Sequence, residues 1–217
     1  SCPTRATQLI KLCHEILPTA TRVHRYDNQN SPDCPRCLAL PESIDHLLQC
    51  PVPDRVTWAT STLRQLSTVS RSRPDHHDII LDIFLSGLEQ WMSGACLLKD
   101  SYPVQFHDLI QSQEAIGWNQ ILRGRVSILW AKHVDEALAL KSTSHPSSSG
   151  DLWVKAMVLK FWERFFVLWE ERNAVVLLRE LRQLHSLRSE VLPGDLIFFI
   201  APTPEEDTNI DSFVESH

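Results

Sequence analysis

Residues 34–51 read CPRCLALPESIDHLLQCP, and this stretch decides the interpretation of the chain. It places Cys34, Cys37, His46 and Cys50 in the pattern Cys-x2-Cys-x8-His-x3-Cys. A Cys-x2-Cys turn lets two sulfur atoms approach one metal ion at about 2.3 Å. Residues four positions apart, such as His46 and Cys50, lie on the same face of a helix. The pattern therefore predicts one metal ion held by three thiolates and one imidazole.

The donor set favours Zn²⁺ in a structural role, because soft thiolates select zinc and four protein ligands leave no position for water. A short helix is expected to carry the last two ligands. Pro41 suits its first turn, Glu42 complements its N-terminal dipole, and Pro51 closes it. Three thiolates leave the zinc site with a charge of −1, which Arg36 would partly offset. A module this small needs the metal to fold.

Other interpretations of the cysteine cluster stay open. Cys13, His14 or His24 could replace one of the four ligands, but an intervening loop of unknown shape makes their distance from the cluster variable and disfavours them. The Cys-x2-Cys pair could instead be redox-active, or the four residues could be close in sequence by chance.

Composition places the chain among ordinary globular proteins. It has 217 residues, of which 43% are hydrophobic and 22% are charged. The net charge of −6 comes from the C-terminal end, because residues 190–217 hold seven acids and no Lys or Arg. The near-neutral remainder neither requires nor excludes a nucleic-acid partner. No apolar run of about 18 residues predicts a membrane span.

The chain starts at Ser1 without a Met or a signal peptide. We therefore expect it to be part of a longer intracellular protein, in the nucleus or the cytoplasm.

The hydrophobic periodicity predicts an all-α fold. A zinc-knuckle module is expected over residues 1–53, a helical domain over 54–200 and a disordered acidic tail over 201–217. Within them, helices are expected over 5–17, from Asp54 to about 69, over 75–99, over about 112–140, and from Asp151, as the N-cap, to about 192. Residues 70–74 and 142–150 are expected to be a linker and a loop, and 195–200 a short apolar clip.

Two expectations concern burial. The helix after Asp54 should bury the stripe Val56, Leu63, Leu66 and Val69. The aromatic residues of the long last helix occupy more than one face, which predicts a buried central helix or one that contacts a partner. They are Trp153, Phe161, Trp162, Phe165, Phe166 and Trp169.

Other motifs favour ordinary structural roles. His76-His77-Asp78 is typical of a polar helix start. His107-Asp108 could be a general base with its orienting acid, but no nucleophile or Gly-rich oxyanion loop lies near it in sequence. Basic residues at Arg123, Arg125 and along 155–172 could follow a phosphate backbone, although the interleaved glutamates favour a solvated helix face.

Residues 11–51 resemble the zinc-binding region downstream of the polymerase in non-LTR retrotransposon reverse transcriptases. That family has a Lys-containing helix ending in Leu-Pro-Thr, a basic loop, Cys-Pro-x-Cys, an acid with Ser or Thr, His-Leu and Cys-Pro. The matching residues here are Lys11, His14, Leu17-Pro18-Thr19, Arg22, Arg25, Cys34-Pro35-Arg36-Cys37, Glu42-Ser43, His46-Leu47 and Cys50-Pro51. Residues 117–138 and 161–176 are more loosely similar to the helical C-terminal parts of such proteins.

The resemblance implies a nucleic-acid-associated accessory domain without polymerase activity. Lys11, His14, Arg22, Arg25 and Arg36 would face RNA or DNA. The chain has no Tyr-x-Asp-Asp motif, so it lacks the carboxylates that hold catalytic metal ions for nucleotidyl transfer. We therefore expect neither an enzyme nor a small-molecule substrate. The alternative is a structural interaction domain, in which zinc stabilises a helical bundle that packs on the parent polymerase or on a second copy.

Overall fold

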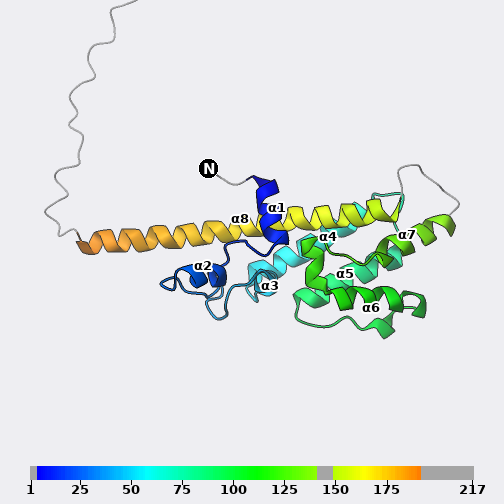
Figure 1. The fold of residues 1–217 in the computed structure, drawn as a ribbon, viewed down its shortest axis with the longest axis horizontal. Coiled ribbons are helices and arrows are strands. Elements are labelled where there is room, and N and C mark those ends of the chain that lie inside the picture. The colour runs from blue at the N-terminus through cyan, green and yellow to red at the C-terminus, as the bar shows by residue number, and fades with distance from the viewer. Residues whose placement is uncertain (1–3, 141–148, 192–217) are drawn as a thin grey trace, which may run out of the picture. The chain divides into compact units, whose positions relative to one another are not determined.

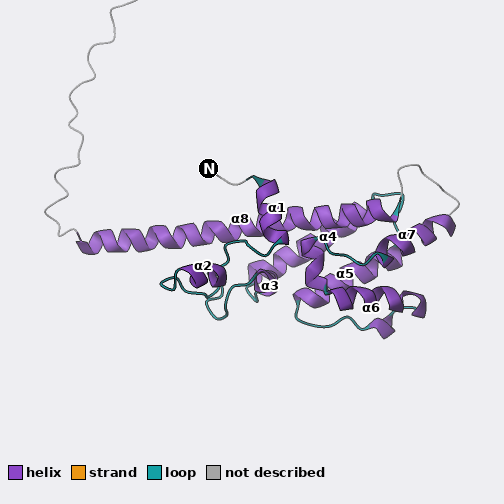
Figure 2. Ribbon diagram, in the orientation of Figure 1, coloured by secondary structure: helices purple, strands orange, loops and turns teal. Residues whose placement is uncertain are grey.

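The computed structural model describes residues 4–140 and 149–191, and no strand occurs among them (Figure 2). The all-α prediction is confirmed. The chain divides into two compact units, Ser1–Val175 and Val176–His217. Both the knuckle and most of the predicted helical domain therefore belong to the first unit. The expected clip at 195–200 and acidic tail at 201–217 lie outside the described residues, as does most of the expected loop at 142–150.

Three short helices form the N-terminal region: α1 (Arg5–Cys13), α2 (Ala20–Tyr26) and α3 (Ile44–Gln49) (Figure 1). The expected helix over 5–17 is wrong at its end, because Glu15 has a φ of 58° that a continuing helix cannot accommodate. Helix α2 lies where a loop was expected. Helix α1 lies across α8, and Arg5 comes within 3.9 Å of Glu170 there.

Helices α4 (Pro53–Arg71) and α5 (Asp78–Met92) pack against each other. Pro53 occupies the first position of α4, so the predicted start is nearly correct. The predicted apolar stripe is partly wrong: Leu66 is buried, but Val56 is 61% exposed and Trp58 is buried instead. The expected linker is shorter than 70–74, since the helix runs through residue 71.

The single helix expected over about 112–140 is wrong. The chain instead forms α6 (His107–Ile116), the 3-10 helix η3 (Trp118–Arg123) and α7 (Leu129–Leu140), after two further 3-10 turns, η1 (Lys99–Ser101) and η2 (Val104–Phe106). Gly117 and Gly124 separate these helices with φ values of 98° and 75°, a region that favours glycine.

Buried Gln113 holds the segment between α6 and α7 in place. Its side-chain oxygen accepts hydrogen bonds from the Ser127 amide at 3.0 Å and from the Trp130 indole at 2.9 Å. Its side-chain amide donates to the Gly117 carbonyl at 3.1 Å. A fully buried amide is thus satisfied on both sides, as burial requires.

The last helix, α8 (Gly150–Val191), is 42 residues long. Its first turn is capped by Ser149, whose hydroxyl accepts from the Leu152 amide at 3.3 Å, rather than by Asp151 as expected. The predicted burial of the aromatic residues is confirmed except at Trp162, which is partly buried, and Trp153 lies beside Phe84 with ring centroids 5.6 Å apart. The buried aromatic residues of this helix are Trp153, Phe161, Phe165, Phe166 and Trp169.

The second unit contains the end of α8. From residue 177 to 186 every described side chain is exposed, in contrast to the buried stripe of the same helix in the first unit. The exposed residues include four leucines, Leu177, Leu178, Leu181 and Leu184.

Candidate metal centre

The four predicted ligands converge. The Sγ atoms of Cys34, Cys37 and Cys50 and a ring nitrogen of His46 all lie within 4.8 Å of one another. Within residues 4–140 and 149–191, these four form the single group of three or more possible ligands at such distances. The four side chains therefore come together as predicted and could hold one metal ion.

The spacing within the cluster fits a tetrahedral metal site. Metal–sulfur bonds of about 2.3 Å and metal–nitrogen bonds of about 2.0 Å place two sulfurs about 3.8 Å apart, and sulfur and nitrogen about 3.5 Å apart, in a tetrahedron. The Cys34 and Cys50 sulfurs are 3.9 Å apart, and the Cys37 sulfur is 3.4 Å from His46 Nε2. A disulfide would need a sulfur–sulfur distance of about 2.05 Å. Two of the ligand–ligand distances thus match the edges of a tetrahedral site, and all of them are at most 4.8 Å.

A tight turn positions the first two cysteines. The Cys34 carbonyl accepts from the Leu38 amide at 2.9 Å, and the Cys34 amide donates to the Leu40 carbonyl at 2.8 Å. Leu38 has a φ of 57°, which reverses the chain direction after Cys37. This backbone places both sulfurs on the same side of the turn.

Helix α3 positions the other two ligands. Ser43 is its N-cap, and its hydroxyl accepts from the His46 amide at 2.9 Å. Cys50 is the C-cap rather than a residue of the last turn, so the helix is shorter than the sequence predicted at both ends. Pro41 precedes the N-cap by two residues instead of occupying the first turn.

Arg55 closes the C-terminal end of α3, a role that the sequence pattern did not indicate. Its Nε donates to the Leu47 carbonyl at 2.9 Å, and one Nη donates to the Leu48 carbonyl at 2.8 Å. The guanidinium lies over the Trp58 ring, 3.7 Å from its centroid. Burial lowers the pKa of Arg55 to about 9, and the nearby Cys50 sulfur opposes this shift. The group stays cationic near neutral pH, beside a cluster that becomes anionic when thiolates form.

Burial sets the protonation of the metal-free cluster. It raises the pKa of the Cys34 thiol and raises that of Cys50 to about 12. It also lowers the pKa of His46, so the imidazole is neutral and ready to ligate. For Cys37, burial raises the pKa, but hydrogen bonds from the Ala39 and Leu40 amides outweigh it and the pKa is lowered. A bound cation must therefore displace thiol protons, so metal affinity should increase with pH.

A buried ion pair joins this region to α8. Both carboxylate oxygens of Glu42 accept hydrogen bonds from the Arg172 guanidinium, and the Oε1–Nε distance is 2.9 Å. Glu42 also accepts a hydrogen bond from the Ala20 amide at 2.6 Å. Both residues are buried, and Arg172 lies over the Trp169 ring. A second ion pair, between Arg36 and Glu171 at 3.5 Å, lies beside it. The sequence showed Glu42 as a motif residue but gave no signal for its partner 130 positions away.

The alternative ligands lie apart from the cluster. His24 Nδ1 is 2.6 Å from the Asn30 carbonyl, and Cys13 is the last residue of α1. Neither they nor His14 belong to the group of converging ligand atoms. The four residues of the Cys-x2-Cys-x8-His-x3-Cys pattern are therefore the metal candidates.

The basic residues assigned to nucleic acid have different surroundings. Lys11 is in the last turn of α1, and His14 follows as its exposed C-cap. Arg22 and Arg25 are both on α2, where Arg25 is exposed. The Arg36 side chain is only 12% exposed because it pairs with Glu171.

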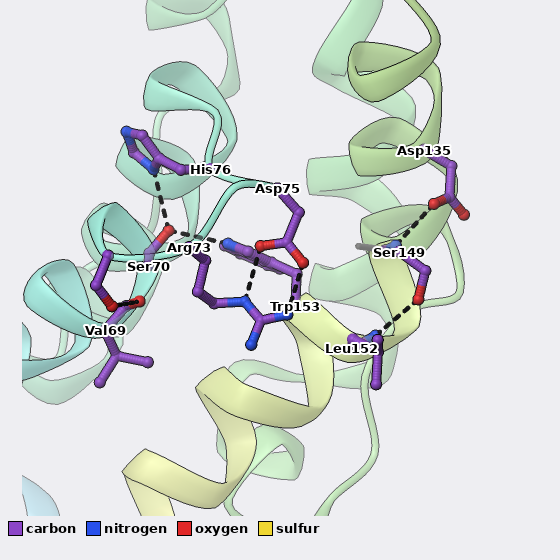
Figure 3. A network of polar contacts seen from close by, with 11 residues as sticks. Val69, Ser70, Arg73, Asp75, His76, Asp135, Ser149, Leu152 and Trp153 are labelled. Atoms are coloured by element: carbon purple, nitrogen blue, oxygen red, sulfur yellow. Dashed lines mark hydrogen bonds and ion pairs between the residues drawn. The ribbon is translucent and has the colours of Figure 1, made fainter. Parts of the chain in front are cut away.

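A serine, a histidine and an aspartate form a series between α4 and α5, and Figure 3 shows its first two members, Ser70 and His76. Ser70 Oγ is 3.2 Å from His76 Nδ1, and His76 Nε2 is 3.0 Å from Asp78 Oδ1. Ser70 is fully buried, however, and its oxygen accepts from the Trp153 indole at 2.9 Å. A substrate cannot reach this hydroxyl in the observed packing. The series, with the neighbouring Arg73–Asp75 ion pair, fixes the α4–α5 turn against α8.

His107 and Asp108 have separate partners. His107 Nε2 is 2.9 Å from the Tyr102 carbonyl, whereas Asp108 Oδ1 is 3.3 Å from His133 Nε2. The structure thus gives no general base oriented by the neighbouring acid in this dipeptide.

Comparison with protein-family models, with curated proteins and with solved structures gives no match for this chain. Among the described helices, none combines the length and apolar character needed to cross a membrane. The interpretation of the site therefore depends on its own geometry.

Proposed function

We propose that Cys34, Cys37, His46 and Cys50 bind one structural Zn²⁺ ion. The observation that supports this is the match between the ligand–ligand distances of 3.9 and 3.4 Å and the edges of a tetrahedral zinc site. A set of three sulfur donors and one nitrogen donor binds Zn²⁺ in preference to hard cations, which prefer oxygen donors. Because four protein ligands fill the tetrahedron, the ion has no free position for a substrate or a reactive water.

We further propose that this zinc module is the zinc-binding region of a reverse transcriptase derived from a non-LTR retrotransposon. It would serve as a nucleic-acid-associated accessory domain and have no polymerase activity itself. The motif residues and their order support this. Segment 11–26 adds three basic side chains and one acid, with Arg22 and Arg25 one turn apart on α2. Arg36, which pairs with Glu171, would contribute least to binding.

Titration of labelled single-stranded RNA and DNA with the zinc-loaded 217-residue chain tests this function. We expect dissociation constants at least as tight as about 10⁻⁴–10⁻⁶ M at low salt, and affinity that decreases steeply with salt, because phosphate contacts release counterions. Binding weaker than about 10⁻⁴ M at low salt would contradict the proposal.

The matched variants for this titration remove two charges each. Arg22→Gln with Arg25→Gln should weaken binding. Arg179→Gln with Arg182→Gln removes the same charge from exposed positions of α8 and should leave binding unchanged. Equal losses in both double variants would indicate a general charge effect and not a site at α2.

A second candidate function is a protein-interaction domain in which zinc only stabilises the fold. The exposed leucines 177, 178, 181 and 184 support it, since one helix segment presents four large apolar side chains. Sedimentation of the chain at rising concentration tests this function. Association that persists at high salt and is lost in Leu181→Ser with Leu184→Ser would support it, and a monomer at all concentrations would contradict it.

A further inference from the structure

The N-terminal region that holds the candidate metal centre is here called the metal module, and the rest of the first unit the helical body. A polar cavity of about 180 Å³ lies where the two meet. Residues of the α1–α2 segment and the start of α3 form most of its lining, and η3 contributes Arg123. Three arginines therefore line one cavity although Arg123 is about 100 positions from the other two. The cavity is smaller than the pockets of about 300–1,000 Å³ that hold drug-sized ligands. Its size suits a single polar group and not a whole nucleotide.

Arg123 is buried at this cavity beside two acids. Its side chain is 6% exposed, Nε is 2.9 Å from Glu15 Oε1, and Nη2 is 4.0 Å from Asp45 Oδ1. Its Nη1 is buried without a hydrogen-bond partner. A buried guanidinium N–H group without an acceptor costs folding free energy, and an acceptor from a bound ligand would remove that cost.

Arg22 and Arg25 add positive charge to the lining and have no ion pairs of their own among the described residues. Arg22 donates to two neutral acceptors, the Glu15 carbonyl and the Tyr26 hydroxyl, each at 3.3 Å. Within the described part of the chain, neither arginine has a carboxylate at ion-pair distance. Glu15 is paired with Arg123, and the three arginines outnumber the two acids of the lining.

We propose that this cavity binds a phosphate group of a nucleic-acid backbone. Arg22 and Arg25 supply the uncompensated charge, and Arg123 supplies a preorganised donor from the helical body. The inference rests on the proposed nucleic-acid function and makes it more specific. It requires both regions, because the metal module alone lacks Arg123. The two acids of the lining weaken binding of a free anion, so a polymer with several phosphates is the preferred ligand.

The test uses the zinc-loaded full chain and a labelled single-stranded RNA, with titrations at two salt concentrations. The Arg22→Gln, Arg25→Gln double variant should lose about tenfold in affinity at low salt, and the dependence of log K on log salt should become less steep by about 0.7, the contribution of one phosphate on a single strand. Arg123→Gln should also weaken binding. Because Arg123 is buried, the circular dichroism and zinc content of the Arg123→Gln protein are measured first. If that protein does not fold, the Arg22→Gln, Arg25→Gln double variant provides the test.

Inorganic phosphate, followed through the arginine side-chain NMR signals, distinguishes the two sources of phosphate. We expect inorganic phosphate to cause small chemical-shift changes at Arg22, Arg25 and Arg123. RNA should cause changes at the same side chains at a much lower concentration. Tight binding of inorganic phosphate with no RNA binding would overturn the assignment to nucleic acid. RNA binding that is unchanged in the Arg22, Arg25 and Arg123 variants would overturn the cavity while leaving the nucleic-acid function intact. Absence of any RNA binding by the wild type would instead contradict the proposed function.

Discussion

The metal module and the helical body belong to one compact unit but are stabilised differently. In the module, α2 has no buried residue, and the apolar burial of α3 comes from three side chains, Ile44, Leu47 and Leu48. In the body, Phe84, Trp130 and Trp153 form an aromatic core with ring centroids 5.2–6.2 Å apart. On the proposed function, one unit combines a region that depends on a bound ion with a region that depends on apolar burial.

Removal of the metal should produce the largest difference between the two regions. Zinc binding supplies about 10–16 kcal/mol in zinc-finger peptides, more than local packing in the module can replace. After chelation we expect amide exchange to become fast over residues 20–50, while the near-ultraviolet circular dichroism of the aromatic core is retained. Loss of both signals together would show that the body also depends on the metal.

Glu42→Gln should have the next largest effect, because it leaves Arg172 buried without an ionised partner. Removing one member of a buried ion pair costs about 3–5 kcal/mol. Urea unfolding of the zinc-loaded protein measures this loss. Glu171→Gln is the matched control: its pair with Arg36 is half-exposed on the acid side, so the cost should be at most about 1 kcal/mol. Equal costs for the two variants would contradict the role assigned to Glu42.

Gly87→Ala should destabilise the body and not the metal centre. A Cβ at this position would lie 1.9 Å from the Trp118 ring, so the ring or α5 must shift. Overpacking of this kind costs about 1–3 kcal/mol. Thermal unfolding should show the loss, with zinc stoichiometry unchanged. An unchanged midpoint would mean that Trp118 is not packed against α5.

Ser43→Ala should give the smallest effect, and it should appear at the metal. Loss of the α3 N-cap costs about 1 kcal/mol, equivalent to about fivefold in zinc affinity if the cap holds His46 in place. Competition with a chromophoric chelator measures that affinity. Thr4→Ala removes the N-cap of α1 and serves as the control, with no expected change in zinc affinity. A similar loss in both variants would argue against a specific role for Ser43.

The sequence was sufficient to predict the convergence of the four possible ligands and the helical class, because both depend on local spacing. Cys-x2-Cys and His-x3-Cys place their donors through turns and helices of a few residues. The burial of the aromatic residues of α8 was equally predictable, because they recur at helical spacing along the sequence. Helix ends were less predictable: Glu15 ends α1 early, and Gly117 and Gly124 break a segment whose apolar period continues through both glycines.

Contacts between distant residues could not be read from the sequence. Arg172 meets Glu42 and Arg123 meets Glu15, across 130 and 108 positions respectively, and no local pattern encodes either pair. Arg55 looks like an ordinary surface residue of an amphipathic helix, yet it is buried where it caps α3. Such residues become visible only when the fold brings them together.

X-ray absorption at the zinc edge of the purified full chain tests the central claim most directly. We predict one zinc per chain with three sulfur neighbours at about 2.3 Å and one nitrogen neighbour at about 2.0 Å. A spectrum with oxygen neighbours in place of sulfur, or a protein without stoichiometric metal whose cysteines are oxidised, would contradict it.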